Sequence, residues 1–346
     1  MLQSPTKNVV RLILIGFGSV HQHFARILLD KAPLLRRRYA RDLLVVGVGD
    51  SGGAVYQTEG LDLATLLAHK QAGNSVCTLP HGVAMADALS LARSGDYDLL
   101  LEASPVNLND GEPALGCVRS ALARGRSAVL ANKAPLVLDY EALHDLAQRN
   151  QAKLAFSATV CGGLPVVNVG ERDLVGATIH KIEGIFNSTT NYILSRMATG
   201  EDYESALAEA QRRGLAETDP SLDVDGWDTA NKLVIIANAV LGASTTLADV
   251  TVEGISGVGS KQLAGAKANG RRIKLVATAE QQGERYRFAV RPRQVPADSF
   301  LGGVVDWQMG IVFHTDIYEE ISMKVDERDP TATAAAMLRD VITLTR

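Results

Sequence analysis

Residues 9–18 read Val-Val-Arg-Leu-Ile-Leu-Ile-Gly-Phe-Gly, and this stretch decides the fold. A β-branched apolar run ends at two glycines, and the helical pattern Phe24, Ile27, Leu28 follows. In a dinucleotide-binding unit, Gly16 would make the tight turn and Gly18 would let the backbone approach a pyrophosphate. The amides of the helix N-terminus would then face that phosphate. The stretch therefore predicts an NAD or NADP site, with an ordinary strand–turn as the alternative.

The third position of the dinucleotide pattern departs from the rule, because residue 21 is histidine where glycine is usual. That glycine normally lets the helix pack closely on the strand. We therefore expect His21 either to tilt the helix or to turn its ring outward.

Further apolar strands alternate with helices along the first half of the chain. Strands are expected at 43–48, 98–103 and 127–131, a helix at 115–124, and a glycine-rich loop at 52–60. Strands that are apolar throughout and separated by helices indicate an α/β fold with a parallel, doubly wound sheet of the Rossmann type.

The pattern changes to mixed α+β in the second half. Strands are expected at 181–186, 271–277, 286–290, 311–315 and 320–325, and helices at 190–197, 203–213 and 330–344. We predict a dinucleotide-binding domain over 1–155, completed by the C-terminal helix 329–346. We predict a substrate-binding, catalytic and dimerisation domain over 156–328, in which the strands from 311 to 325 meet a second subunit.

Composition excludes several classes of protein. The chain has 346 residues, which exceeds one ordinary core and suggests two domains. Its net charge is −4 and it has no basic stripe with interleaved aromatics, so nucleic-acid binding is not expected. No apolar run is long enough for a membrane span, and no signal peptide is evident. Three separated cysteines indicate neither a disulfide frame nor a zinc site, and we expect a cytoplasmic protein.

The cofactor preference stays open. Asp50 follows the second strand, where an acid would bind ribose hydroxyls and favour NAD. Arg36, Arg37, Arg38 or Arg41 could instead bind the additional phosphate of NADP.

A cluster of acids precedes an apolar helix in the second half. It contains Glu217, Asp223 and Asp228, with Lys232 four residues after the last of them. A helix that starts near residue 225 puts Asp228 and Lys232 one turn apart on the same face. An ammonium beside a carboxylate could donate and accept a proton, while the other acids bind the ammonium of a substrate. A solvated surface pair is the alternative.

With these motifs the chain resembles homoserine dehydrogenases over nearly its whole length. The resemblance is carried by residues 16–20, 102–105, 131–133, 158–165, 184–194, 214–220, 228–232 and 332–340. It implies interconversion of L-homoserine and L-aspartate 4-semialdehyde with NAD or NADP, within threonine and methionine biosynthesis. It also implies a homodimer that acts on a small-molecule substrate.

The resemblance assigns roles to individual residues. It makes Lys232 the proton donor and acceptor, with Asp228 and Glu217 binding substrate and Asp223 a candidate member of the same network. Thr189 would lie in the substrate pocket, and Lys133 between nicotinamide and substrate. Cofactor contacts would come from Gly16, Phe17, Gly18, Ser19, Val20 and Ser104. Backbone carbonyls of Val160, Gly162 and Leu164 would hold Na⁺ or K⁺.

Three positions depart from the family pattern and motivate alternatives. Ser188 replaces a common glycine, which suggests a related oxidoreductase acting on another amino-acid-derived aldehyde. His21, together with Ser157 at a position where many members have a cation-binding glutamate, suggests a non-catalytic NAD(P)-binding sensor. A C-terminal regulatory domain is not expected, since the sequence ends soon after the closing helix.

Overall fold

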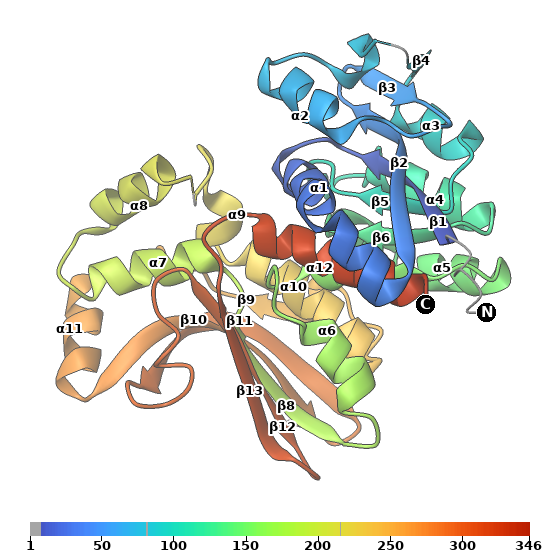
Figure 1. Cartoon of the computed structure of the whole chain (residues 1–346). Coiled ribbons are helices and arrows are strands. Elements are labelled where there is room, and N and C mark those ends of the chain that lie inside the picture. The colour runs from blue at the N-terminus through green and yellow to red at the C-terminus, as the bar shows by residue number, and fades with distance from the viewer. Residues whose placement is uncertain (1–7, 81, 215) are drawn as a thin grey trace. The chain divides into compact units, whose positions relative to one another are not determined.

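The computed structural model describes residues 8–80, 82–214 and 216–346 (Figure 1). The chain forms two compact units. The first comprises Met1–Gly163 together with Asp329–Arg346, and the second comprises Leu164–Arg328.

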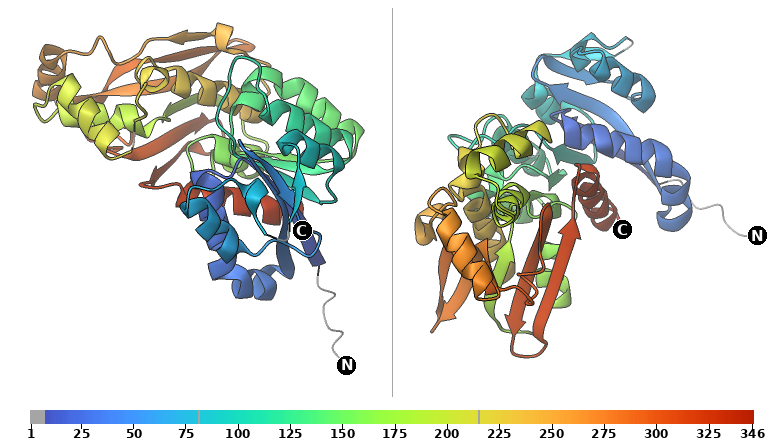
Figure 2. Two further views of the ribbon diagram at one scale, coloured as in Figure 1. Left: turned by 90° about the horizontal axis from the view of Figure 1, so that it is seen from above. Right: turned by 90° about the vertical axis from the view of Figure 1, so that its left-hand side faces the viewer.

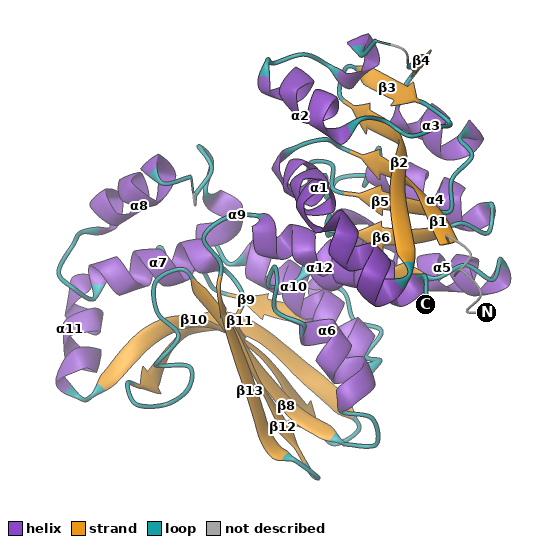
Figure 3. Ribbon diagram, viewed as in Figure 1, coloured by secondary structure: helices purple, strands orange, loops and turns teal. Residues whose placement is uncertain are grey.

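A seven-stranded sheet with the order β4-β3-β2-β1-β5-β6-β7 organises the first unit (Figure 3). Its parallel strands are β1 (Asn8–Ile15), β2 (Arg41–Asp50), β5 (Leu99–Glu102), β6 (Ser127–Leu130) and β7 (Leu154–Ala155). The strand order reverses between β1 and β5, and such a switch point is where open α/β sheets bind ligands. The predicted Rossmann-type sheet is confirmed.

Two antiparallel strands extend this sheet where only a glycine-rich loop was expected. They are β3 (Gly53–Tyr56), which pairs with β2, and β4 (Val83–Met85), which pairs with β3. The prediction of a loop over 52–60 was wrong for its first half, because Ala54 and Val55 between the glycines are apolar and become fully buried.

Six α-helices accompany the sheet in the described part of the first unit. They are α1 (Ser19–Tyr39), α2 (Leu63–Gln71), α3 (Ala88–Ser94), α4 (Ala114–Ala123), α5 (Ala134–Arg149) and α12 (Thr331–Leu344). Short 3₁₀ turns lie at η1 (Val76–Thr78) and η2 (Ser157–Thr159).

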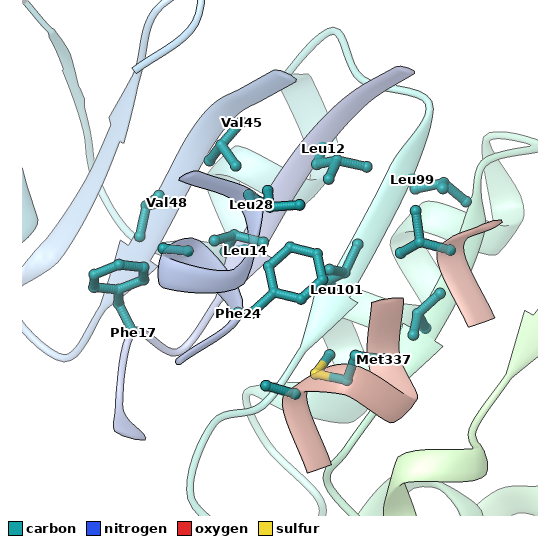
Figure 4. Close-up of a cluster of buried hydrophobic side chains, with 14 of the residues drawn as sticks. Leu12, Leu14, Phe17, Phe24, Leu28, Val45, Val48, Leu99, Leu101 and Met337 are labelled. Atoms are coloured by element: carbon teal, nitrogen blue, oxygen red, sulfur yellow. The ribbon is translucent and has the colours of Figure 1, made fainter. Parts of the chain in front are cut away.

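The last helix of the chain belongs to the first unit. Helix α12 lies against α1 (Figure 2), and Met337 packs into the same buried cluster as Phe24 and Leu101 (Figure 4). All three side chains are fully buried. The sheet, α1 and α12 therefore share one hydrophobic core.

The second unit is built on a six-stranded sheet with the order β13-β12-β8-β10-β11-β9. These strands are β8 (Ile179–Ile185), β9 (Val250–Val252), β10 (Arg271–Gln282), β11 (Arg285–Pro296), β12 (Gln308–Thr315) and β13 (Glu319–Asp326). The expected hairpin of β10 and β11 forms, with Gln282 opposite Arg285. Strand β13 lies at one edge of the sheet.

The α-helices of this unit are α6 (Val166–Asn168), α7 (Ser188–Met197), α8 (Tyr203–Arg212), α9 (Ser221–Val224), α10 (Trp227–Ile236) and α11 (Ser260–Ala268). Single turns of other helix types lie at η3 (Val169–Asp173), η4 (Ala237–Leu241) and η5 (Leu247–Asp249). Helices α7 and α10 both contact β10. In the described ranges, no helix combines the length and apolarity needed to cross a bilayer.

Helix α10 begins where the sequence predicted. Gly226 precedes it with φ of 88°, a left-handed conformation that glycine adopts without strain. Leu233, Val234, Ile235 and Ile236 are all buried, so the second half of the helix is fixed in the core. Its first turns carry Asp228 and Lys232, the predicted acid and lysine.

Candidate active site

The glycine turn after β1 touches the end of the neighbouring strand. Gly16 has φ of 77°, and a Cβ atom added there would lie 2.6 Å from Cα of Ser104 and 2.8 Å from the carbonyl oxygen of Ala103. No larger residue fits this turn without moving the chain. Glycine at position 16 therefore lets the carboxyl ends of β1 and β5 meet closely.

The N-terminus of α1 is open toward an anion. Gly18 is the N-cap residue and makes no side-chain cap, and a methyl group added at its Cα would meet no atom within 4 Å beyond its immediate neighbours. The first turn holds no acid, and Ser19 is exposed while Phe17 is buried in the core. Uncapped amides at the positive end of a helix fit a pyrophosphate. These residues thus suit the dinucleotide that the sequence predicted.

His21 supports the turn from inside, and the expectation that its ring points outward was wrong. The ring is fully buried, and its Nδ1 donates a hydrogen bond to the carbonyl oxygen of Gly16. Burial lowers the pKa of His21 to about 4, against the opposing effect of that hydrogen bond. The imidazole is therefore neutral at physiological pH. The reason is local: a carbonyl left free by the left-handed turn needs a donor, and His21 provides it.

Asp50 lies at the end of β2, as expected, and is held by four donors. One oxygen accepts from Ser75 Oγ at 2.7 Å and from the Gly52 amide at 2.9 Å. The other accepts from Lys70 Nζ at 2.7 Å and from the Val76 amide at 3.0 Å. Burial opposes its ionisation, but these bonds together hold the pKa of Asp50 below its ordinary value. A ribose hydroxyl would have to share oxygens that already have partners.

A second buried acid was not assigned a role from the sequence. Glu102 ends β5, and its Oε1 accepts hydrogen bonds from the amide of Ser104 at 2.8 Å and from its hydroxyl. Burial raises the pKa of Glu102 to about 7. The sequence signal was present, since an acid closing an apolar strand is unusual.

Lys133 and its neighbour Asn132 follow β6, the next strand of the sheet. Asn132 is buried and accepts from the amide of Ala134 at 2.9 Å, which fixes the start of α5. Lys133 is the N-cap residue of that helix and is partly buried. Because β1, β5 and β6 are parallel neighbours, Gly16, Ser104 and Lys133 all lie at the carboxyl edge of one sheet.

In the second unit, Lys232 and Asp228 form a buried ion pair on α10. Lys232 Nζ lies 2.7 Å from Asp228 Oδ2 and donates to the carbonyl oxygen of Phe186 at 2.7 Å. Their side chains are only 14% and 10% exposed, so the solvated surface pair is excluded. Two acceptors hold the ammonium at a defined position.

Asn187 joins this pair to another acid of the predicted cluster. Its Nδ2 donates to Asp228 Oδ2 at 2.8 Å and to Asp223 Oδ1 at 2.6 Å. The same side chain caps α7 by accepting from the amide of Thr190 at 2.8 Å. From the sequence, Asn187 was expected only as part of the motif at residues 184–194. The end of β8 and the starts of α7 and α10 thereby converge on two carboxylates and one ammonium.

The remaining predicted substrate residues lie on the same unit. Thr189 is buried in the first turn of α7, two residues after Asn187. Glu217 lies between α8 and α9 with an exposed side chain, and its carbonyl oxygen accepts from Gln211 Nε2 at 3.1 Å. The structure thus joins Lys232 directly to Asp228, and joins Asp223 to Asp228 through Asn187.

The predicted cation ligands lie on a segment with two left-handed residues, Cys161 and Gly162. Val160 is buried, and the carbonyl oxygen of Leu164 accepts from the amide of Val166 at 2.8 Å. Ser157 donates from its amide and hydroxyl to Asp340, at 2.8 and 2.7 Å. Within the described ranges, no cluster of three or more His, Cys, Asp or Glu residues is arranged to hold a metal.

Comparison with known proteins identifies the family of the chain. The family model described as homoserine dehydrogenase matches residues 165–342. The homoserine dehydrogenase of Methanocaldococcus jannaschii is 36% identical over 96% of this chain and 97% of its own length. The NAD(+)-dependent homoserine dehydrogenase of Pseudomonas canavaninivorans is 31% identical, over 96% and 95%.

Solved structures give the same result. The putative homoserine dehydrogenase of Archaeoglobus fulgidus superposes with a TM-score of 0.86 at 35% identity, covering 96% of this chain and 98% of that one. A hyperthermophilic archaeal homoserine dehydrogenase in complex with NADPH superposes with a TM-score of 0.85 at 26% identity, covering 97% and 98%. The chain therefore belongs to the homoserine dehydrogenase family.

Proposed function

We propose that this protein catalyses the NAD(P)-dependent interconversion of L-homoserine and L-aspartate 4-semialdehyde. The observation that carries the proposal is the buried contact of Lys232 with Asp228, joined through Asn187 to Asp223. Family membership supplies the substrate, and this cluster supplies groups whose chemistry suits it.

The reaction needs a proton carrier close to the substrate oxygen. A bound nicotinamide supplies or accepts the hydride. When the aldehyde is reduced, its carbon gains the hydride and its oxygen gains a proton from the Lys232 ammonium; in the reverse direction the lysine amine takes that proton. Asp228 and the Phe186 carbonyl orient Nζ for this transfer.

Substrate selection follows from the local charge. Asp223 and Asp228 carry two negative charges against the single positive charge of Lys232, which favours a ligand with its own ammonium group. We include Glu217 among the groups that bind this ammonium and Thr189 among the donors to the substrate carboxylate.

The cofactor would be held at the carboxyl edge of the first unit's sheet. The turn at Gly16, Phe17 and Gly18, the helix start at Ser19 and Val20, and Ser104 would contact the dinucleotide, with Lys133 at the nicotinamide. Relatives support both forms of the cofactor, since one is NAD(+)-dependent and another was solved with NADPH. We retain Asp50 as a ribose-binding candidate, and the carbonyls of Val160, Gly162 and Leu164 as candidates for Na⁺ or K⁺.

We further propose a homodimer that works in threonine and methionine biosynthesis in the cytoplasm. Strand β13 is a sheet edge whose backbone groups can meet a second copy, which supports the dimer. The free thiols of Cys77 and Cys117 suit a reducing compartment. Light scattering on the purified protein tests the dimer, and a monomeric mass contradicts it.

The decisive experiment is homoserine oxidation with NAD and NADP in parallel, with and without Na⁺ or K⁺. We expect reduced nicotinamide to form only when homoserine is present. Cofactor binding without any substrate-dependent reduction would favour a sensor. Faster turnover of an amino alcohol with one carbon more or less than homoserine would favour a related oxidoreductase.

A further inference from the structure

The second unit contains a cavity that the proposed reaction does not use. Its volume is about 440 Å³, within the range of small-molecule sites. It lies between the end of α7, helix α11, the first residues of β10 and the segment around Asp306. Its apolar wall includes Leu194, Leu263 and Ile273. None of the residues assigned above to substrate or cofactor lines it.

Lys274 on β10 lines this cavity and is only 2% exposed. Its Nζ donates to Asn191 Oδ1 at 2.8 Å, and in the described part of the chain this is its one acceptor within hydrogen-bonding distance. An ammonium carries three donors. Burying them with a single neutral partner is costly unless a further acceptor is supplied.

The other charged groups that line the cavity are mainly basic. Arg271 and Arg272 come from β10, Lys267 from α11 and Asp306 from the segment before β12, while α7 contributes none. With Lys274, four cations face one carboxylate. Burial, and then Arg272, lower the pKa of Lys274 to about 8 against the opposing charge of Asp306. The cavity therefore combines apolar walls with an excess of basic side chains, of which Lys274 is buried.

We propose that this cavity binds a small aliphatic carboxylate, whose charged end pairs with Lys274 while its carbon chain contacts Leu194, Leu263 and Ile273. A carboxylate supplies the acceptors that the Lys274 ammonium lacks, in surroundings where a charge-assisted hydrogen bond is strong. An aliphatic chain covers the apolar wall. This inference goes beyond the proposed function and does not depend on it.

Calorimetric titration of the full chain with sodium butyrate, without homoserine or cofactor, tests the site. Butyrate should bind, and n-butylamine should not. Lys274→Met should weaken butyrate binding at least tenfold. The matched control is Lys261→Met, an exposed lysine on α11 that does not line the cavity, and it should bind as the parent protein does. No heat with butyrate, or equal binding by Lys274→Met, overturns the proposal.

Two further variants distinguish binding in this cavity from a folding defect and from binding in the active site. Ala198→Leu places a larger side chain in the cavity lining at the end of α7 and leaves Lys274 in the sequence, and it should also abolish binding. Lys232→Met should leave butyrate binding unchanged. Retained binding in Ala198→Leu overturns the proposal, and so does lost binding in Lys232→Met, because the ligand would then occupy the active site.

The pH dependence gives an independent readout. Butyrate remains ionised above neutral pH, whereas Lys274 loses its charge as the pH passes about 8. Affinity should therefore fall about tenfold between one pH unit below and one unit above that pKa. An affinity that does not change over this window contradicts the assignment of Lys274 as the counter-charge.

Discussion

Lys232 and Asp228 lie one helical turn apart on α10, with Nζ 2.7 Å from Oδ2, and both side chains are almost fully enclosed. An isolated pair of this spacing on a surface contributes little. Here the pair is enclosed and its acid is also bound by Asn187, so the ammonium is held in one place. A fixed proton carrier is what the proposed reaction requires.

Lys232→Met should lower kcat by about 10²–10⁴-fold, because general acid–base assistance is lost. Lys232→Arg should show a similar loss, since arginine keeps the charge but does not release its proton. Cofactor affinity, followed by quenching of protein fluorescence, should not change in either variant. A rate within a few fold of the parent in Lys232→Met would remove this residue from the mechanism.

Asn187→Asp should weaken both folding and homoserine binding. The change replaces a donor to Asp223 and Asp228 by a third carboxylate, so the cluster loses two hydrogen bonds and gains repulsion. We expect a loss of about 1–3 kcal/mol in urea unfolding, together with a raised KM for homoserine. Asn238→Asp is the matched control, because Asn238 is buried and, among the described residues, is bonded only to the backbone of Thr245. It should lose stability and keep its KM.

His21 should make the protein sensitive to acid. Its pKa is about 4 when folded, below the ordinary 6.5, so the unfolded chain binds more protons between these values. Stability should fall by about 3 kcal/mol from this group as the pH drops through that window. His21→Asn keeps a donor for Gly16 and does not titrate. If the free energy of unfolding depends on pH in the same way in His21→Asn and in the parent, His21 is not the source of the acid sensitivity.

The hydrogen bond from His21 to Gly16 should also affect the affinity for the cofactor. His21→Ala removes the donor to Gly16, so the turn loses its support and cofactor affinity should fall several-fold. His21→Asn should keep most of that affinity. Equal affinities in the two variants would show that the turn needs no donor from this side chain.

Glu102 should lower the stability of the protein as the pH rises, whereas His21 lowers it as the pH falls. Its folded pKa is about 7, above the ordinary 4.5, because burial disfavours the carboxylate. The resulting penalty is absent below pH 4.5, grows as the pH rises and is complete above pH 7. Relative to the parent, Glu102→Gln should therefore gain about 3 kcal/mol of stability across this window in urea unfolding. A difference that is constant with pH would contradict the assignment.

Local patterns predicted most of the fold. The strand, glycine turn and helix at 9–28 are encoded by neighbouring residues, and so is the start of α10 at Gly226. Strand β3 was missed because it is short and begins at a glycine, and its pairing with β2 and β4 makes it extended.

The site was harder to predict where it depends on distant contacts. Asn187 meets Asp228 across 41 residues of sequence, and no periodic pattern reports such a contact. Asp50 was correctly placed at the end of β2, but its four donors come from segments that the fold brings together. Residue type suggested the chemistry, whereas the partners that tune it emerged only from packing.

The position of α12 has a consequence for biosynthesis of the protein. Residues 164–328 form one continuous stretch, so the second unit needs no later part of the chain to complete its core. The first unit cannot complete its core until residues 331–344, with Met337, have left the ribosome. The unit that would carry the dinucleotide is therefore begun first, yet its core is completed only after the whole second unit has been made.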